Sequence, residues 1–295
     1  MEKSDFEDVQ KKHPEIGTKI DKVGVKGVRK KISTKTPKDD FFYDVSLDAF
    51  VDLPNDMRGT HMSRDIEAFT EAIEEANKEG SSSLEEVLKD ISERLLRKHK
   101  YANRVELIAN TQHQYEEDFI GSPTTEIANV TIRVTNHRNE EDNRTVEVEL
   151  PGISVCPCAQ RTYRDVEGIE SQAPSHTQRV NLSIKVTTQE KLVRIGWLID
   201  AARESFSAPI SSLLKRKDEY ELIKHAYSRP KFIEDLVRYA VYHCYKTLKD
   251  EKYPESTTIE VEAESLESIH PHNAYASRKA TVGNLKREEE NFRSD

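Results

Sequence analysis

Long apolar runs are missing from this sequence, and cysteine is scarce in it. No stretch approaches the roughly 18 apolar residues of a membrane-spanning helix, and the first residues, MEKSDFEDVQKKHPEIG, lack the apolar centre of a secretory signal. We therefore expect a cytoplasmic protein without a membrane partner. Only three cysteines occur among 295 residues, and in a reducing compartment cysteines are more often metal ligands or catalytic groups than disulfide partners.

An excess of positive charge is also missing. The chain has 45 Lys and Arg residues against 54 Asp and Glu residues, which gives a net charge of -9 at pH 7. This balance argues against a general affinity for nucleic acid, so a polyanionic ligand must find a local basic cluster. The length is sufficient for a sizeable core, in one large domain or two modest ones.

A clear alternation of apolar and polar residues is present in several segments. Such alternation predicts half-buried strands of antiparallel sheets, with one face on the core and the other in water. The segments lie near residues 105–109, 130–134, 145–150, 180–186 and 259–263, with further strands expected between 18 and 53.

Apolar residues at helical spacing separate these strands. Ser82 and Ser83 are followed three residues later by Glu85 and Glu86, which is typical of a capped helix N-terminus. Cys244 falls on the apolar side of a helix that Pro230 opens, so we expect a buried core residue there. The helices expected from this spacing cover 64–78, 83–99, 190–206 and a segment beginning at Pro230.

The order of the expected elements indicates one unit used twice. Residues 18–151 and 176–285 each combine strands with two helices, which predicts an α+β fold of two tandem antiparallel-sheet-plus-helices modules. Residues 152–175 hold two of the cysteines and many turn-forming residues, and we expect them to form a connecting loop. The charge-dense ends, 1–17 and 286–295, are expected to be flexible.

Cys156 and Cys158 flank Pro157 directly after an expected strand. A structural zinc site usually takes two pairs of ligands, and the remaining cysteine, Cys244, lies inside an expected helix, so such a site is disfavoured. Two interpretations remain for the pair. One thiolate could belong to a mixed site with His or carboxylate ligands and an open position, or both could be ordinary thiols.

Histidines near strand ends are candidates for the other ligands of a mixed site. A lone histidine there is most often a hydrogen-bonded surface residue, but three of the ten histidines share this position: His176, His270 and His272. His61 lies just before an expected helix. His99 lies in a very polar segment, like His13 and His137, and we expect all three to be solvated.

Two acidic positions have both an ordinary and a functional interpretation. Glu267 is either a surface charge or a carboxylate that accepts hydrogen bonds from the N1–H and amino group of guanine. The run Lys-Arg-Lys-Asp-Glu at 215–219 is either a solvated helix end or a phosphate-binding cluster with a carboxylate beside it.

Six segments together resemble the type IB and type IV GTP cyclohydrolases, in the same chain order. They are GTHMSR at 59–64, CPC at 156–158, HTQR at 176–179, LKRKDE at 214–219, PKFIED at 230–235 and ESIH at 267–270. The resemblance extends from about residue 18 to residue 282. It implies the tunnelling fold, and a homotetramer whose active sites form at subunit boundaries.

The resemblance also implies which residues carry the chemistry. Three residues would hold a divalent metal: Cys156, His176 and Glu219. Such a metal lowers the pKa of water, which then attacks C8 of GTP, so that the ring opens and formate leaves. Catalytic roles fall to three residues: His270, Cys158 and His176. Substrate contacts fall to five: Glu267 on the guanine, Lys215, Arg216 and Arg179 on the triphosphate, and His61.

The residues after Cys158 favour one branch of this family. Ala159-Gln160 and the long run from Arg161 to Ser175 resemble type IV, which uses Fe(II) and makes 7,8-dihydroneopterin 2′,3′-cyclic phosphate, formate and pyrophosphate in pterin biosynthesis. Type IB, which makes 7,8-dihydroneopterin triphosphate, is the alternative. The ligand types would also accept Zn(II) or Mn(II). A thiolate-based metal or redox sensor is the alternative outside enzymes.

Overall fold

The computed structural model describes residues 8–35, 40–79, 83–118, 123–169 and 172–292. The chain divides into two compact units. Unit 1 comprises Met1–Thr111 with Thr131–Arg144, and unit 2 comprises Gln112–Val130 with Thr145–Asp295. The hydrogen-bonded strands follow the order β1-β2-β3-β4-β5-β6-β8-β9, with β7 beside β5.

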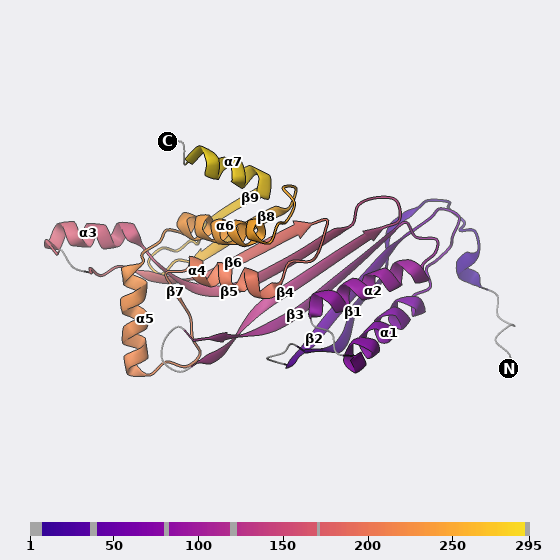
Figure 1. Cartoon of the computed structure of the whole chain (residues 1–295), viewed down its shortest axis with the longest axis horizontal. Helices are drawn as coiled ribbons and strands as arrows, with labels where there is room; N and C mark the ends of the chain where they lie inside the picture. The colour runs from indigo at the N-terminus through magenta and orange to yellow at the C-terminus, as the bar shows by residue number, and fades with distance from the viewer. Residues whose placement is uncertain (1–7, 36–39, 80–82, 119–122, 170–171, 293–295) are drawn as a thin grey trace. The chain divides into compact units, whose positions relative to one another are not determined.

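Unit 1 contains strands covered by two helices, α1 and α2, which lie side by side against β1 (Figure 1). β1 pairs antiparallel with β2, and β2 pairs antiparallel with β3. The predicted cap of α2 is confirmed, because the Ser83 hydroxyl accepts a hydrogen bond from the Glu86 N–H at 3.2 Å. The elements are β1 (Ile20–Lys35), β2 (Asp40–Leu53), α1 (Ser63–Glu79), α2 (Leu84–Lys98), parts of β3 (Arg104–Glu117) and β4 (Thr124–His137), and a 3-10 helix at Val9–Lys11.

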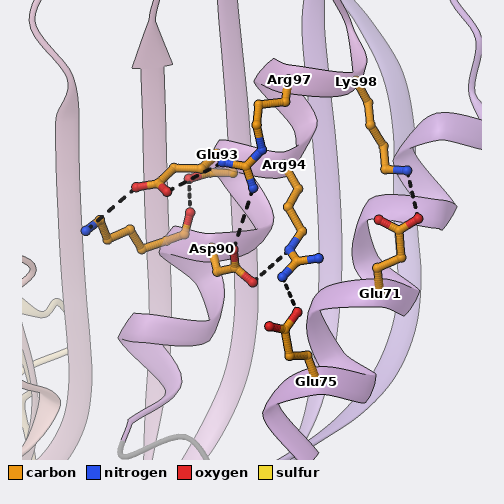
Figure 2. A network of polar contacts seen from close by, with 9 residues as sticks. Glu71, Glu75, Asp90, Glu93, Arg94, Arg97 and Lys98 are labelled. Carbon is orange, nitrogen blue, oxygen red and sulfur yellow. Dashed lines mark hydrogen bonds and ion pairs between the residues drawn. The ribbon is translucent and has the colours of Figure 1, made fainter.

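Ion pairs join α1 to α2 on their solvent side (Figure 2). Arg94 contacts Glu75 across the two helices, and Lys98 Nζ lies 2.8 Å from Glu71 Oε1. Exposed pairs of this kind contribute about 0.2–1 kcal/mol each. The contact between the helices and the sheet therefore depends mainly on their buried apolar residues, such as Phe69 and Ile91, which are fully buried.

His99 is fully buried in unit 1, so the prediction that it is solvated was wrong. Its Nε2 lies 2.7 Å from Asp65 Oδ1, and its Nδ1 lies 2.8 Å from the Tyr101 hydroxyl. That hydroxyl lies 2.6 Å from Thr60 Oγ1. Polar neighbours in the sequence misled the prediction, because the residues that enclose His99 come from α1 and from the turn after α2.

Unit 2 contains the remaining strands and helices. β6 pairs antiparallel with β8, which pairs antiparallel with β9, and α4 and α6 pack against each other, with α6 also contacting β8 and β9 (Figure 1). The elements are β5 (Asn143–Val155), α3 (Pro157–Glu167), β6 (Thr177–Thr188), α4 (Ile195–Ser205), β7 (Ala208–Pro209), α5 (Arg216–Ser228), α6 (Ile233–Asp250), β8 (Thr258–Leu266), β9 (Ala274–Thr281) and α7 (Val282–Phe292).

The core of unit 2 follows the predicted alternation. Val180, Leu182, Ile184 and Val186 of β6 are each 0% exposed. Cys244 is buried as predicted, and burial raises the pKa of its thiol to about 12. Among the described helices, none combines the length and hydropathy needed to cross a membrane.

Two segments predicted to lack regular structure are helical. Residues 157–167, inside the expected connecting loop, form α3, and α7 extends through most of the expected flexible C-terminus. Both helices are largely polar, so their sequences lack the long apolar stripe on which the prediction relied. The predicted division into modules at 18–151 and 176–285 follows chain order, and it stays a prediction.

Gly152 provides a stability test close to the two cysteines. A Cβ atom at this position would lie 2.2 Å from Cγ of Phe206, whose ring is buried. We expect Gly152→Ala to lower the free energy of unfolding by about 1–3 kcal/mol, because the new methyl group would force the buried ring or the main chain to shift. Chemical denaturation of both proteins measures the difference.

Gly196 in α4 is the matched control for that substitution. It is exposed, and a Cβ atom there would meet nothing within 4 Å. Gly196→Ala should leave the stability unchanged or raise it by up to about 1 kcal/mol, because alanine loses less backbone entropy in a helix. Equal effects of the two substitutions would contradict the close contact between Gly152 and Phe206.

Candidate active site

Cys156 is held at the start of a helix that directly follows β5. It is the N-cap residue of α3, with Pro157 in the first helical turn, and its Sγ accepts a hydrogen bond from the Ala159 N–H at 3.4 Å. Cys156 is half-buried, whereas Cys158 in the first turn of α3 is exposed.

Main-chain contacts hold His176 beside Cys156, although the two residues are far apart in the sequence. The Cys156 N–H donates a hydrogen bond to the His176 carbonyl at 3.2 Å, and the Ser175 hydroxyl donates to the Cys156 carbonyl at 2.6 Å. Tyr227 at the end of α5 donates its hydroxyl to the Ser175 carbonyl at 2.9 Å. The main chain at the end of β5 and the main chain at the start of β6 are therefore held together at the residues that carry the thiol and the imidazole.

The His176 ring is oriented by Gln178, which was not among the predicted site residues. His176 Nδ1 lies 2.9 Å from the Gln178 side-chain oxygen. With the proton on Nδ1, the Nε2 lone pair is free to bind a cation. The signal that could have identified Gln178 is its spacing, since residues two apart on a strand lie on the same face.

Glu267 and two further histidines gather at the same edge of the sheet. Glu267 Oε2 lies 4.0 Å from His176 Nδ1, and Glu267 Oε1 accepts a hydrogen bond from the Ser265 hydroxyl at 2.7 Å. The His270 ring packs edge-on against His176 with 6.3 Å between ring centroids, and His272 stacks on His270 at 5.3 Å. These groups come from the start of β6 and from the segment after β8.

The predicted cationic cluster lies at the N-terminus of α5. Lys215 is the N-cap residue, and its N–H donates to Asp218 Oδ2 at 3.0 Å. Lys215, Arg216 and Glu219 are exposed. Glu219 precedes Leu222 and Ala226 by three and seven residues, so it shares with them the side of α5 that packs against Val155.

The described ranges contain no set of three or more His, Cys, Asp or Glu side chains grouped so that they could hold a metal ion. Cys156 and His176 are neighbours, and Glu219 lies on the helix beside them without joining the group. Arg179 is exposed near the start of β6. His61 belongs to unit 1, where its Nε2 lies 3.0 Å from Asp8 Oδ1.

Comparison with known proteins gives consistent matches along nearly the whole chain. The family model for type I GTP cyclohydrolase folE2 matches residues 6–276. The GTP cyclohydrolase MptA of Aeropyrum pernix is 37% identical over 281 residues, covering 95% of this chain and 97% of the relative. The proteins of the same name from Methanobrevibacter smithii and Methanosphaera stadtmanae are 33% and 32% identical, covering 95% and 98% of this chain and 97% and 99% of the relatives.

Among solved structures, a uricase from Arthrobacter globiformis is similar in fold. It matches with a TM-score of 0.51 at 10% sequence identity, covering 88% of this chain and 93% of the uricase. At this identity the likeness concerns the fold alone. It confirms the predicted tunnelling fold, an α+β architecture with an antiparallel sheet and helices.

Proposed function

This chain belongs to the type I GTP cyclohydrolase family, and from this premise we propose that it opens the imidazole ring of GTP at C8 and releases formate. The observation that carries the proposal is the cluster at the edge of the sheet in unit 2. There the main chains of Cys156 and His176 are hydrogen-bonded to each other, and the side chains of Glu267 and His270 lie beside the His176 ring.

Members of this family require a metal ion, and the side chains of this chain include donor groups that can bind one. Cys156 offers a thiolate at a helix N-terminus, His176 offers Nε2 with its Nδ1 side occupied by Gln178, and Glu219 offers a carboxylate. We propose that Glu219 completes this set in the assembled, metal-loaded enzyme. A bound divalent cation would supply Lewis acidity, which lowers the pKa of water toward neutral pH.

Glu267 is proposed to hold the guanine base. Its side chain is only 10% exposed, and the Ser265 hydroxyl fixes one of its oxygens. A carboxylate accepts hydrogen bonds from the N1–H and amino donors of guanine, whereas adenine has no N1–H donor. Adenine would leave a buried acceptor unpaired, so ATP should be a poor substrate.

The other proposed roles follow from position and charge. His270 beside His176 accepts and returns protons during ring opening, with Cys158 as an assisting group. Lys215 and Arg216 at the N-terminus of α5 bind the triphosphate together with Arg179, because cations and the helix N-terminus both favour phosphate.

We propose a homotetramer as the working form, with the chain's two modules at 18–151 and 176–285 in each subunit. Residues of more than one subunit would then build each site, and His61 of unit 1 would reach the substrate in this way. Fe(II) is the metal proposed, with Zn(II) and Mn(II) as alternatives that the same donor set accepts.

The proposed products are 7,8-dihydroneopterin 2′,3′-cyclic phosphate, formate and pyrophosphate, as expected for a pterin pathway. Full-length relatives named GTP cyclohydrolase MptA support this branch. Phosphorus NMR of the product made anaerobically with Fe(II) tests it. A cyclic phosphodiester signal together with free pyrophosphate is expected, whereas an intact triphosphate chain would assign the chain to type IB chemistry.

A further inference from the structure

Lys231 lies between α5 and α6 and is only 6% exposed. Its ammonium group donates hydrogen bonds to the carbonyls of Ser205, Phe206 and Glu204 at 2.7, 3.1 and 3.3 Å. These are the last residues of α4 and its C-cap, where carbonyls have no partner within the helix. The ammonium also lies 4.2 Å from the centroid of the Tyr239 ring.

The main chain of the same residue holds the end of β5. The Lys231 N–H donates to the Val155 carbonyl at 3.0 Å, and the Ser154 hydroxyl donates to the Lys231 carbonyl at 2.9 Å. Ser154 and Val155 are the two residues immediately before Cys156. Lys231 therefore joins the strand that leads into the cysteine to the end of α4.

A charged side chain at this position is costly. Burial, together with the nearby Arg229 guanidinium, lowers the pKa of Lys231 to about 8. An apolar side chain such as methionine could fill the same space without the cost of desolvating a charge. The three carbonyls explain why an ammonium is present, since it satisfies all of them at once.

We propose that Lys231 is a positioning residue for Cys156: its two sets of hydrogen bonds fix the last two residues of β5, directly before the thiol, and so fix Sγ relative to the imidazole of His176. This inference rests on the proposed role of Cys156 and His176 as metal ligands. Residues that orient metal ligands commonly change metal affinity by about 10- to 100-fold when they are replaced.

Cobalt titration of the metal-free protein tests this role, because thiolate-bound Co(II) has a characteristic near-ultraviolet absorption. We expect Lys231→Met to weaken Co(II) binding by about 10- to 100-fold and to reduce the thiolate band at saturation. Lys246→Met, at a half-buried lysine of α6, is the matched control, and it should leave both quantities unchanged. A folded Lys231→Met protein with the wild-type affinity and spectrum would overturn the proposal.

A milder substitution covers the case in which Lys231→Met does not fold. Ser154→Ala removes only the hydrogen bond to the Lys231 carbonyl, and we expect it to weaken Co(II) binding by about 3- to 10-fold. Unchanged binding by this protein would overturn the proposal as well. A wrong assignment of Cys156 as a metal ligand would give a different result. In that case the Cys156→Ser protein would bind Co(II) as the wild type does.

Discussion

Replacement of Glu267 by glutamine is expected to lower kcat/KM for GTP by about 10³-fold or more. The proposed carboxylate faces two donors of guanine, and glutamine would replace one acceptor by an NH₂ group that opposes a donor. Glu267 is nearly buried and its other contact, from Ser265, is a donor that fixes the orientation, so the side chain has little freedom to avoid the mismatch. Formate release at varied GTP concentration measures the effect.

The metal content of the Glu267→Gln protein distinguishes a loss of guanine binding from a loss of the metal site. Glu267→Gln should retain as much Fe(II) as the wild-type protein, because Glu267 is not one of the proposed ligands. Glu262→Gln is the control, since Glu262 is an exposed residue in the middle of the same strand, β8. Wild-type turnover by Glu267→Gln would show that another group holds the base.

Replacement of Cys156 by serine is expected to abolish both metal retention and formate release. A serine hydroxyl is a far weaker ligand than a thiolate, so the loss of one ligand of three should remove the metal and, with it, the activity. Metal content after dialysis, measured by elemental analysis, and formate release report the two losses separately.

Cys158→Ser is the matched control for Cys156→Ser, because the two thiols lie two residues apart in the same helix start. Cys158 is exposed, while the Cys156 main chain is fixed by His176 and Ser175. Cys158→Ser should keep the metal and lose only part of the activity. If Cys158→Ser lost the metal and Cys156→Ser kept it, the ligand assignment would be wrong.

Much of the fold could be predicted from alternation and helical spacing, because those patterns record burial directly. The strand at 180–186 and the helix that contains Cys244 are examples, since their apolar residues form the core. α3 was missed because only Gln160 of its eleven residues is buried. Its termini still carried signals, namely Pro157 at the start and Gly168 at the end, where φ is +65°.

The site was less accessible to sequence reasoning, because it depends on contacts between distant segments. Motif order predicted a site that includes Cys156, His176 and Glu267, but only the structure reveals the main-chain hydrogen bond between the first two. The polar residues next to His99 in the sequence could not reveal that Asp65 lies against its ring. The role of Lys231 was equally hidden, since its partners lie in α4 and β5.

The most direct test of the proposed ring opening follows the C8 atom of GTP. Fe(II)-loaded protein is incubated anaerobically with GTP carrying carbon-13 at C8, and the products are followed by carbon NMR. We predict that the label leaves as formate, in one equivalent per GTP consumed. Label that remains in the purine, or GTP that stays intact with metal bound, would contradict it.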